Sequence, residues 1–178
     1  MSTVEKLDKT GTPLTQEFED LFREHYQLVY RTACTVTGSP EDAEDVLQTI
    51  FLRLLRRAVP PDFRQNPKGY FYRAAVNLSL NTIRLRNKQV LTGDAEVFEG
   101  YPPTDSSGVD AGIHKRLLEG IATLSPRSVE ILILRYVYDY TEPQIAALLR
   151  RSRGTIAVTL FRSRARLRKL LRSSGERV

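Results

Sequence analysis

The chain of 178 residues contains one cysteine, no tryptophan and no long apolar run. A single cysteine, Cys34, excludes an internal disulfide and a zinc site built from clustered cysteines. No apolar stretch approaches the roughly 20 residues that a membrane-spanning helix needs. The N-terminus also lacks the hydrophobic segment of a secretion signal. We therefore expect a cytoplasmic protein that does not enter a membrane.

Residue patterns that support catalysis are scarce as well. The two histidines, His25 and His114, lie far apart in the sequence, each within an amphipathic helical pattern. The chain has no GxSxG motif, P-loop, HExxH motif or dinucleotide-binding fingerprint. Carboxylates are plentiful, but a carboxylate on a helix is usually solvated rather than catalytic. We expect no enzymatic activity, no metal site and no cofactor.

Positive charge is what the chain has in excess. The net charge of +6 favours an acidic polymer as partner, although the distribution of charge matters more than its sum. Between Arg150 and Arg172 there are nine arginines or lysines and no acid. This segment is where we expect the acidic partner to bind.

Residues 141–171 have the pattern of two short helices joined by a turn. Thr141 can cap the first helix and Gln144 can complete a capping box. Ser152 can cap the second helix, in which apolar residues recur at helical spacing. This pattern is typical of a helix-turn-helix that lays its second helix in the major groove of DNA. The alternatives are a solvated basic face, a membrane-surface helix or a partner-binding tail. These three alternatives require neither the capped first helix nor the turn, so the pattern favours the helix-turn-helix.

Helical periodicity dominates the remaining segments and none has the pattern of a strand, so we predict an all-α fold. Residues 1–14 lack periodicity and are predicted to be mobile. Residues 15–90 are predicted to form one small helical domain and residues 111–173 a second, which contains the helix-turn-helix. Residues 91–110 carry five acids and no base among Gly, Pro and Ser, which predicts a flexible acidic linker.

Local signals place the helix ends within the first domain. Gly38 is expected to end a long first helix. Ser39 followed by Pro40 is expected to cap and begin the second. Asn66 followed by a proline is the same combination of cap and first helical residue. It is expected to begin a third helix, which runs to about residue 88.

Three residue strings coincide with one family. They are SPEDAEDVLQTIFLRLL (39–55), YFYRAAVNLSLNTIRLRNK (70–88), and LSPRSVEILILRYVYDYTEPQIAALL with GTIAVTLFRSRARLRKLL (124–149 and 154–171). In this order they resemble the polymerase-binding helix, the promoter-melting segment and region 4 of a sigma-70 family factor. The resemblance covers residues 17–172. It is to the small extracytoplasmic-function type, which has only regions 2 and 4.

The outward face of the second predicted helix combines acids with protruding leucines. The face comprises Glu41, Glu44, Asp45, Gln48 and Leu52. A rigid half-acidic face with leucines suits docking on another protein, whereas the alternative is a solvated helix face. The resemblance implies that the partner is core RNA polymerase, contacted at the β′ clamp helices by this domain and at the β flap by region 4.

The third string interleaves aromatic and basic residues, which suits melted DNA because rings stack on unpaired bases and cations follow phosphates. The candidate minus-ten residues are Lys68, Tyr70, Tyr72, Arg73, Asn77, Asn81, Arg84 and Arg86. Asn77 matches the family asparagine that receives a base flipped from the non-template strand. A helix C-cap is the alternative role. Most family members carry a tryptophan near Tyr70 or Phe71, and this chain has none. At least one of the rings at positions 70–72 is expected in the core, and the sequence does not tell which.

The candidate minus-thirty-five residues lie in the helix-turn-helix: Arg151, Arg153, Thr155, Ala157, Val158, Thr159, Phe161, Arg162 and Arg166. The arginines at 151, 153 and 166 and the two threonines are expected to contact phosphates, which fix register without specifying sequence. Ala157 and Val158 replace the Lys or Arg and the Ser of many relatives, so base preference stays open. Small apolar side chains can meet thymine methyls but cannot grip guanine as arginine does.

We therefore expect an alternative sigma factor that binds core polymerase, recognises double-stranded and melted promoter DNA, and helps to open the duplex. The alternatives are a free-standing helix-turn-helix regulator, which binds its operator alone, and an adaptor with a basic tail, which shows no sequence preference. Family members are often held inactive by an anti-sigma factor, but no residue here identifies one. Promoter sequence, regulon, inducing signal and source organism are not encoded in any motif of the chain.

Overall fold

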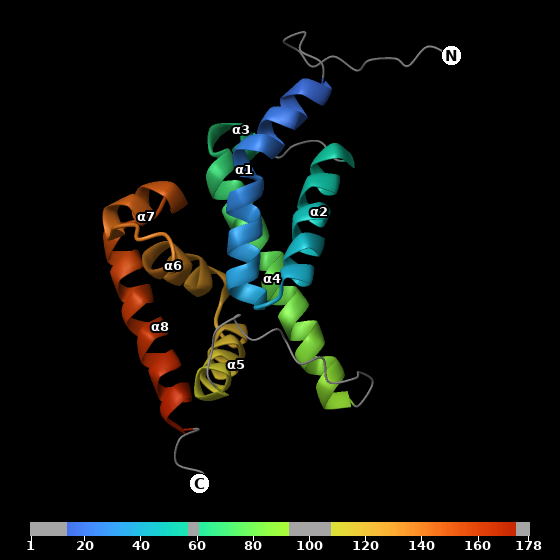
Figure 1. Cartoon of the computed structure of the whole chain (residues 1–178). Coiled ribbons are helices and arrows are strands. Elements are labelled where there is room, and N and C mark those ends of the chain that lie inside the picture. Colours follow the sequence, from blue (N-terminus) through green and yellow to red (C-terminus); the bar gives the residue numbers. More distant parts are fainter. Residues whose placement is uncertain (1–13, 57–60, 93–107, 174–178) are drawn as a thin grey trace.

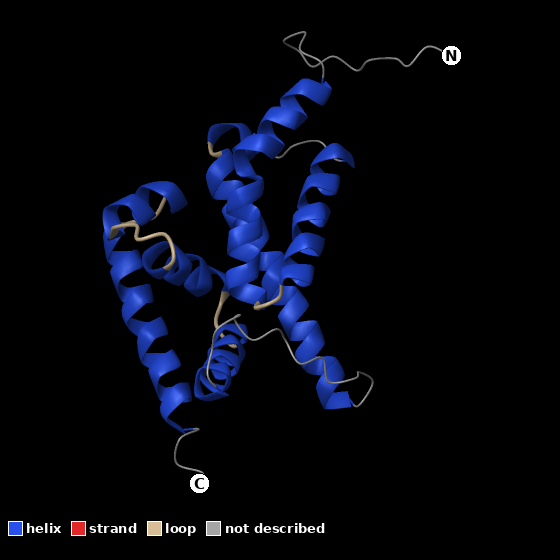
Figure 2. Ribbon diagram, viewed as in Figure 1, coloured by secondary structure: helices blue, strands red, loops and turns tan. Residues whose placement is uncertain are grey.

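The computed structural model describes residues 14–56, 61–92 and 108–173. In these ranges the chain forms helices and no strand (Figures 1 and 2). The helices are α1 (Leu14–Thr37), α2 (Pro40–Arg56), α3 (Pro61–Gln65), α4 (Pro67–Thr92), α5 (Gly108–Ala122), α6 (Pro126–Tyr136), α7 (Glu142–Leu149) and α8 (Arg153–Ser173). The predicted all-α class is confirmed. The N-terminal segment 1–13 and most of the predicted linker lie outside the described residues.

Five helices, α2, α4, α6, α7 and α8, begin at caps that the sequence predicts, at Ser39, Asn66, Ser125, Thr141 and Ser152. A side-chain oxygen accepts a hydrogen bond from the backbone amide three residues on at Ser39 (3.2 Å), Asn66 (2.9 Å), Ser125 (3.2 Å) and Ser152 (3.2 Å). At α7, the Thr141 amide donates to Gln144 Oε1 at 2.8 Å within a capping box. Each cap satisfies an amide that has no partner inside its helix. These local contacts explain why the helix starts are predictable.

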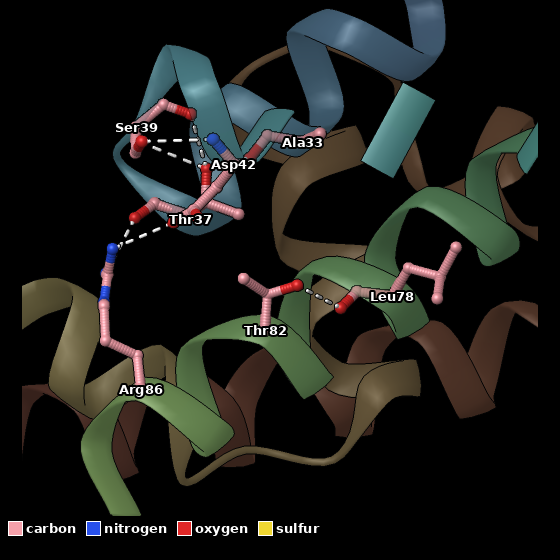
Figure 3. A network of polar contacts seen from close by, with 7 residues as sticks. All are labelled: Ala33, Thr37, Ser39, Asp42, Leu78, Thr82 and Arg86. Atoms are coloured by element: carbon pink, nitrogen blue, oxygen red, sulfur yellow. Dashed lines mark hydrogen bonds and ion pairs between the residues drawn. The ribbon is translucent and has the colours of Figure 1, made fainter. Parts of the chain in front are cut away.

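A tight corner joins α1 to α2. Gly38 lies there at φ +68°, and a Cβ at this position would come within 2.5 Å of Leu118 Cδ1 in α5. The corner is also tied to the distal part of α4, where Arg86 donates to Asp42 Oδ2 at 2.9 Å and to the Thr37 carbonyl at 3.1 Å (Figure 3). The left-handed backbone favours glycine at position 38, and any larger residue there would also require the Leu118 side chain to shift.

The helices α1 to α4 form an N-terminal unit with its own core. Its buried residues are Val29, Ala33, Ala43, Val46, Ile50, Phe51, Phe63, Phe71 and Ala75. Phe71 is the centre of this core, with its ring 5.1 Å from that of Phe51 and 5.5 Å from that of Phe63. The short helix α3, which supplies Phe63, was not predicted, because one turn of helix has no measurable periodicity.

The helices α5 to α8 form a C-terminal unit that packs directly on α4. One buried cluster joins four residues of α4 to the apolar residues of α6, α7 and α8; the α4 residues are Tyr72, Val76, Leu80 and Ile83. In Figure 1, α6 and α7 lie beside α1 and α4, while α2 lies on the opposite side of the N-terminal unit. Helix α4 is therefore buried on two faces, one in each core.

The helix-turn-helix is present as α7, a three-residue turn and α8. Arg150 ends α7 in the left-handed conformation at φ 52°, and its amide bonds back to α7. The amide of Arg151 donates to the Ala146 carbonyl at 2.8 Å, which closes the turn. On α8, Ile156 and Leu160 are buried against the rest of the unit. The opposite face of α8 is left exposed.

Candidate nucleic-acid and partner interfaces

The predicted minus-thirty-five residues lie on α8, except Arg151, which lies in the turn before it. Arg151, Arg153, Thr155, Ala157, Val158, Phe161, Arg162 and Arg166 are exposed, and Thr159 is half-buried. Phe161 is 68% exposed and Val158 is 48% exposed, so two large apolar side chains project among arginines. A cationic helix with an apolar fringe can place its first turns in a major groove while its arginines lie near phosphates.

The hydroxyls at the start of α8 are engaged with one another. The Ser152 and Thr155 hydroxyl oxygens lie 2.9 Å apart, and the Thr159 hydroxyl donates to the Thr155 carbonyl at 2.7 Å. A phosphate that approaches this turn can take the Ser152 hydroxyl in exchange for the Thr155 contact. The Thr159 hydroxyl proton is bound within the helix, so this hydroxyl has no proton left to donate to a phosphate unless that bond breaks.

The predicted docking face of α2 is exposed as well. Glu41, Glu44, Asp45 and Gln48 all face solvent, and Leu52 and Leu55 are 46% and 59% exposed. The buried side of the helix is formed by Ala43, Val46, Ile50 and Phe51. Because α2 lies across the N-terminal unit from α6 to α8, the C-terminal unit leaves this face open (Figure 1).

The structure settles which rings of α4 are core. Phe71 and Tyr72 are both fully buried, whereas Tyr70 is half-buried and packs edge-on to Phe63 at 5.1 Å. Phe71 faces the N-terminal core, and Tyr72 packs against Tyr138 of the C-terminal unit at 5.7 Å. In this conformation Tyr72 is therefore not accessible to DNA.

Three of the predicted minus-ten cations contact protein groups. Lys68 Nζ lies 2.6 Å from the Tyr140 hydroxyl. Arg84 donates to the carbonyls of Ala122 (3.0 Å) and Leu124 (2.8 Å), just past the end of α5. Arg86 is held by Asp42 and Thr37, as described above. Lys68 and Arg84 thus contact the C-terminal unit, whereas Arg86 stabilises the N-terminal unit itself.

Asn77 and Asn81 are exposed side chains of α4. The alternative role of Asn77 as a helix C-cap is wrong, because the helix continues from Pro67 to Thr92 without interruption. Beyond Asn77, Leu80 and Ile83 of the same helix are buried in the cluster that α4 shares with the C-terminal unit. The Asn77 amide is therefore presented from the side of a helix.

A cleft of about 460 Å³ lies between α4 and the C-terminal unit. Its lining residues are Arg73, Asn77, Ser125, Pro126, Arg127, Glu130, Leu149 and Arg151. Glu130 is only 7% exposed. Burial raises the pKa of its carboxyl to about 7, although Arg73, Arg127 and Arg151 oppose the shift. Three arginines thus surround an acid that lacks a close ion pair in the part of the chain that the structure describes.

Arg127 and Glu130 were missed by the sequence analysis. Glu130 lies in a run of six buried residues, Val129 to Leu134. An acid within such an apolar run is a usable signal, since a buried carboxylate needs compensation. Arg127 carries no comparable signal, because an arginine near a helix start is usually solvated.

The described ranges lack two further features, a metal-binding cluster and a membrane-spanning helix. They contain no group of three or more His, Cys, Asp and Glu side chains that could hold a metal ion. None of their helices has the length and apolar character needed to cross a bilayer.

Two protein-family models match the chain. Sigma-70 region 2 matches residues 21–89 and Sigma-70 region 4 matches residues 114–167. The first spans nearly all of α1 to α4, and the second spans most of α5 to α8. The two matches are separated by the segment predicted to be the linker.

Named relatives agree with these matches. The chain is 27% identical over 172 residues to the ECF RNA polymerase sigma factor SigE of Mycolicibacterium smegmatis, covering 92% of this chain and 65% of that protein. It is 28% identical over 155 residues to the RNA polymerase sigma-E factor of Streptomyces coelicolor, covering 87% and 86%. It is 25% identical over 183 residues to the ECF sigma factor SigW of Bacillus subtilis, covering 95% of each.

A solved structure has a similar fold. The sigma factor RpoE of Bartonella quintana, crystallised with the anti-sigma factor NepR, gives a TM-score of 0.51 at 21% identity, covering 88% of this chain and 98% of that one. At this identity the likeness concerns the fold alone. The two family models and the named relatives carry the assignment: the chain belongs to the sigma-70 family of RNA polymerase sigma factors, in the extracytoplasmic-function group.

Proposed function

We propose that this chain is a promoter-specificity subunit that binds core RNA polymerase through α2, reads the melted minus-ten strand with α4 and reads the minus-thirty-five element with α8. The observation that carries the proposal is a pair of exposed faces of opposite charge on separate units. The acidic, leucine-bearing face of α2 suits a protein partner, and the basic face of α8 suits DNA. A free-standing regulator requires only the second face.

The docking step rests on residues 15–90, proposed as region 2. The proposed contacts are Glu41, Glu44, Asp45, Gln48 and Leu52, and the proposed partner is the pair of clamp helices in the β′ subunit. Exposed carboxylates give orientation and a fast encounter, and Leu52, which is 46% exposed, supplies apolar area. Region 4, residues 111–173, is proposed to contact the β flap.

The melting step uses the exposed side of α4. Asn77 projects from a rigid helix, where its amide offers both donors and an acceptor to the edge of an unpaired base. Arg73 and Asn81 accompany it, and Tyr70 is the ring with exposed surface for stacking. Lys68, Tyr72 and Arg84 join this surface only when the C-terminal unit moves away.

The upstream contact uses α8. Arg151, Arg153 and Arg166 are proposed to contact phosphates, and the two threonines are proposed to assist them. Ala157, Val158 and Phe161 are proposed to face base edges, with apolar contacts to thymine methyls rather than hydrogen bonds to guanine. Arg162, one turn along the helix, is the one cation proposed to reach the bases.

The subunit is proposed to catalyse no bond chemistry itself and to act in the cytoplasm, where RNA polymerase works. We also propose an anti-sigma factor as a regulatory partner. Support for this partner comes from RpoE of Bartonella quintana, which was crystallised with one.

Run-off transcription tests the proposal. Purified chain and core polymerase are incubated with a fragmented genomic DNA library, and transcript start sites are sequenced. The expected result is a small set of starts that share two upstream elements and disappear when the chain is omitted. A chain that fails to bind polymerase but binds specific DNA fragments alone would be a free-standing regulator instead.

A further inference from the structure

The cleft between α4 and the C-terminal unit gathers positive charge from three separate elements. Arg73 belongs to α4, Arg127 to the first turn of α6, and Arg151 to the turn between α7 and α8. Within the described ranges, none of these three guanidinium groups makes an ion pair or a hydrogen bond with another residue. Their charges are therefore available to a ligand.

The same cleft contains a carboxyl group that is nearly withdrawn from solvent. Glu130 lines the cleft and is only 7% exposed. Its side chain makes no ion pair and no hydrogen bond in the part of the chain that the structure describes. A buried carboxylate needs hydrogen-bond donors, and this one faces a cleft instead of a protein donor. A ligand in the cleft can supply those donors.

The start of α6 adds to the positive character of the cleft. Its N-cap, Ser125, and its first residue, Pro126, are among the lining residues. A helix start carries partial positive charge and favours an anion. Arginine, in turn, pairs well with the oxygens of phosphate groups, because its planar guanidinium group can donate two parallel hydrogen bonds. The cationic side of the cleft therefore suits a phosphorylated ligand.

The buried carboxyl determines what the other end of that ligand must carry. An ionised carboxylate accepts hydrogen bonds through two oxygens and donates none. Two adjacent N–H donors on one rigid edge match it. Among the nucleobases, guanine presents such a pair, from its ring N–H and its exocyclic amino group. Adenine, cytosine and uracil place an acceptor beside their donor, and a carboxylate repels that acceptor. Glu130 therefore favours guanine.

The dimensions of the cleft suit one free nucleotide. Its volume of about 460 Å³ lies within the range of small-molecule sites, about 300–1,000 Å³, and such sites are common between structural units. A surface for single-stranded nucleic acid is instead an extended cationic groove that follows the backbone. Here the three arginines come from three elements and act on one acid. This arrangement surrounds a compact ligand.

We propose that the cleft is a binding site for a free guanine nucleotide, with its phosphates paired with the three arginines and its guanine edge bonded to Glu130. The site goes beyond the proposed promoter function, which requires no nucleotide here. Arg73, Asn77 and Arg151 are also proposed DNA contacts, so nucleotide and promoter DNA should compete for them. Arg127 and Glu130 have no proposed role in DNA binding, which makes nucleotide binding separately testable.

Calorimetric titration of the full chain with guanosine diphosphate and with adenosine diphosphate is the first test. The two probes carry the same phosphates and differ in the base. Guanosine diphosphate should bind once per chain, more tightly than adenosine diphosphate by about 5-fold to 150-fold, the value of one paired base edge. Absence of guanosine diphosphate binding overturns the site, and equal affinity for the two nucleotides overturns guanine recognition.

Two variants with matched controls assign the contacts. Glu130→Gln keeps the shape of the side chain but loses one acceptor, so affinity for guanosine diphosphate should fall to that for adenosine diphosphate. Arg127→Ala should weaken binding of both nucleotides by at least about tenfold. The controls Glu119→Gln and Arg116→Ala change exposed residues of α5 and should bind as wild type does. A guanine preference that persists in Glu130→Gln, or full affinity in Arg127→Ala, overturns the proposed contacts.

The pH dependence of guanine selection provides a readout of Glu130 itself. Burial raises the pKa of its carboxyl to about 7, and only the ionised form accepts both hydrogen bonds. The charged groups that face it are Arg73 of α4, Arg127 of α6 and Arg151 after α7, and arginine stays charged in this range. The ratio of the two nucleotide affinities, in which phosphate titration cancels, should fall by up to about tenfold from about pH 8 to about pH 6. Glu130→Gln should show no such change, and a constant ratio in wild type overturns the role of Glu130.

A single-stranded oligonucleotide with one guanine separates a free nucleotide from nucleic acid. Wild type and Glu130→Gln should bind this oligonucleotide equally. If Glu130→Gln weakens its binding as much as it weakens binding of guanosine diphosphate, the occupant of the cleft is a DNA strand and the inference fails. Loss of promoter-specific transcription with intact nucleotide binding would instead overturn the proposed function alone.

Discussion

Helices α4 and α8 both carry basic residues proposed to contact DNA, yet they differ in how far these residues are exposed. Helix α8 buries one apolar stripe and exposes its arginines with Val158 and Phe161. Helix α4 is buried on two faces, and its Lys68 and Arg84 are bonded to the other unit. The difference matches the DNA substrates that we propose for them. Duplex DNA is always present for α8, whereas a melted strand exists only after polymerase has bound.

The largest effect is expected from a change on the docking face of α2. None of the residues proposed to contact DNA lies on this face. Asp45→Arg with Gln48→Ala should abolish co-purification with core polymerase, since the reversal of an interface charge costs about 2–5 kcal/mol of binding. Thermal stability should hardly change, because both side chains are exposed. The same variant should still bind duplex DNA through α8, which would show that polymerase docking and duplex binding use separate surfaces.

The control for that experiment is Glu119→Arg, which reverses an exposed acid on α5, away from the docking face. It should co-purify as well as wild type does. Undiminished polymerase binding by the α2 double variant would remove this docking face from the account.

The second effect concerns Glu130, at the boundary that covers α4. Its pKa is raised from 4.5 to about 7 by burial. A raised carboxyl pKa contributes stability that is present below pH 4.5 and is lost as the pH rises toward 7. Glu130→Gln should therefore stabilise the protein relative to wild type above about pH 7, by at most about 3 kcal/mol, with little difference in acid.

Urea unfolding at acidic and at mildly alkaline pH measures this difference. Glu119→Gln, an exposed acid in the same unit, should show no such pH-dependent gain. Equal stability of wild type and Glu130→Gln above neutral pH would mean that Glu130 carries its charge in the fold, paired with the arginines around it.

The third effect concerns reading by α4. Asn77→Ala should reduce transcription from a duplex promoter and should do less harm on a template already melted across the minus-ten region. At the captured base, discrimination should fall by about 1–3 kcal/mol. Because Asn77 is exposed, stability should be unaffected. A mutant that keeps the wild-type preference at every minus-ten base would place the base pocket elsewhere.

The ends of the helices were predictable from the sequence, but the burial of the α4 side chains was not. Caps at Asn66 and Ser125, and the glycine at position 38, are local signals that determine helix ends within a few residues. The burial of Tyr72 depends on Tyr138, which lies 66 positions further along the chain. Periodicity detects that a helix has an apolar face but not which partner covers it. For this reason the sequence favoured two domains on a linker and did not reveal their contact.

The exposed surfaces were the more predictable sites. Residues on α2 and α8 were placed on outward faces correctly, because a solvated face follows from the buried stripe opposite it. On α4, the aromatic residues had two competing roles, core and stacking, and only the packing decided between them. Glu130 and Arg127 became visible only through the cleft that they line with Arg73 and Asn77.

The smallest effects separate phosphate contacts from base contacts on α8. Arg166→Ala should weaken binding about equally on all sequences and lower the salt slope by about one unit. Ala157→Arg should instead increase tolerance for guanine in the upstream element, because arginine can pair with a guanine edge. Arg151→Ala belongs with the first class but also alters the cleft at Glu130, so Arg166 is the cleaner site.

Transcription from a randomised upstream element checks both classes in one experiment. Arg166→Ala should leave the preferred sequence unchanged and reduce yield. If it changes the preferred sequence while Ala157→Arg changes only yield, the two faces of α8 have been assigned in reverse.

The most direct test of the difference between α4 and α8 is a footprint of one promoter with the free protein and with the protein bound to core polymerase. Nuclease protection reports duplex contact at the minus-thirty-five element, and permanganate reactivity of thymines reports melting at the minus-ten element. With polymerase, both signals should appear. With free protein at high concentration, only upstream protection should appear. Protection or melting at the minus-ten element by the free protein would contradict the account, because α4 would then read DNA while the C-terminal unit covers it.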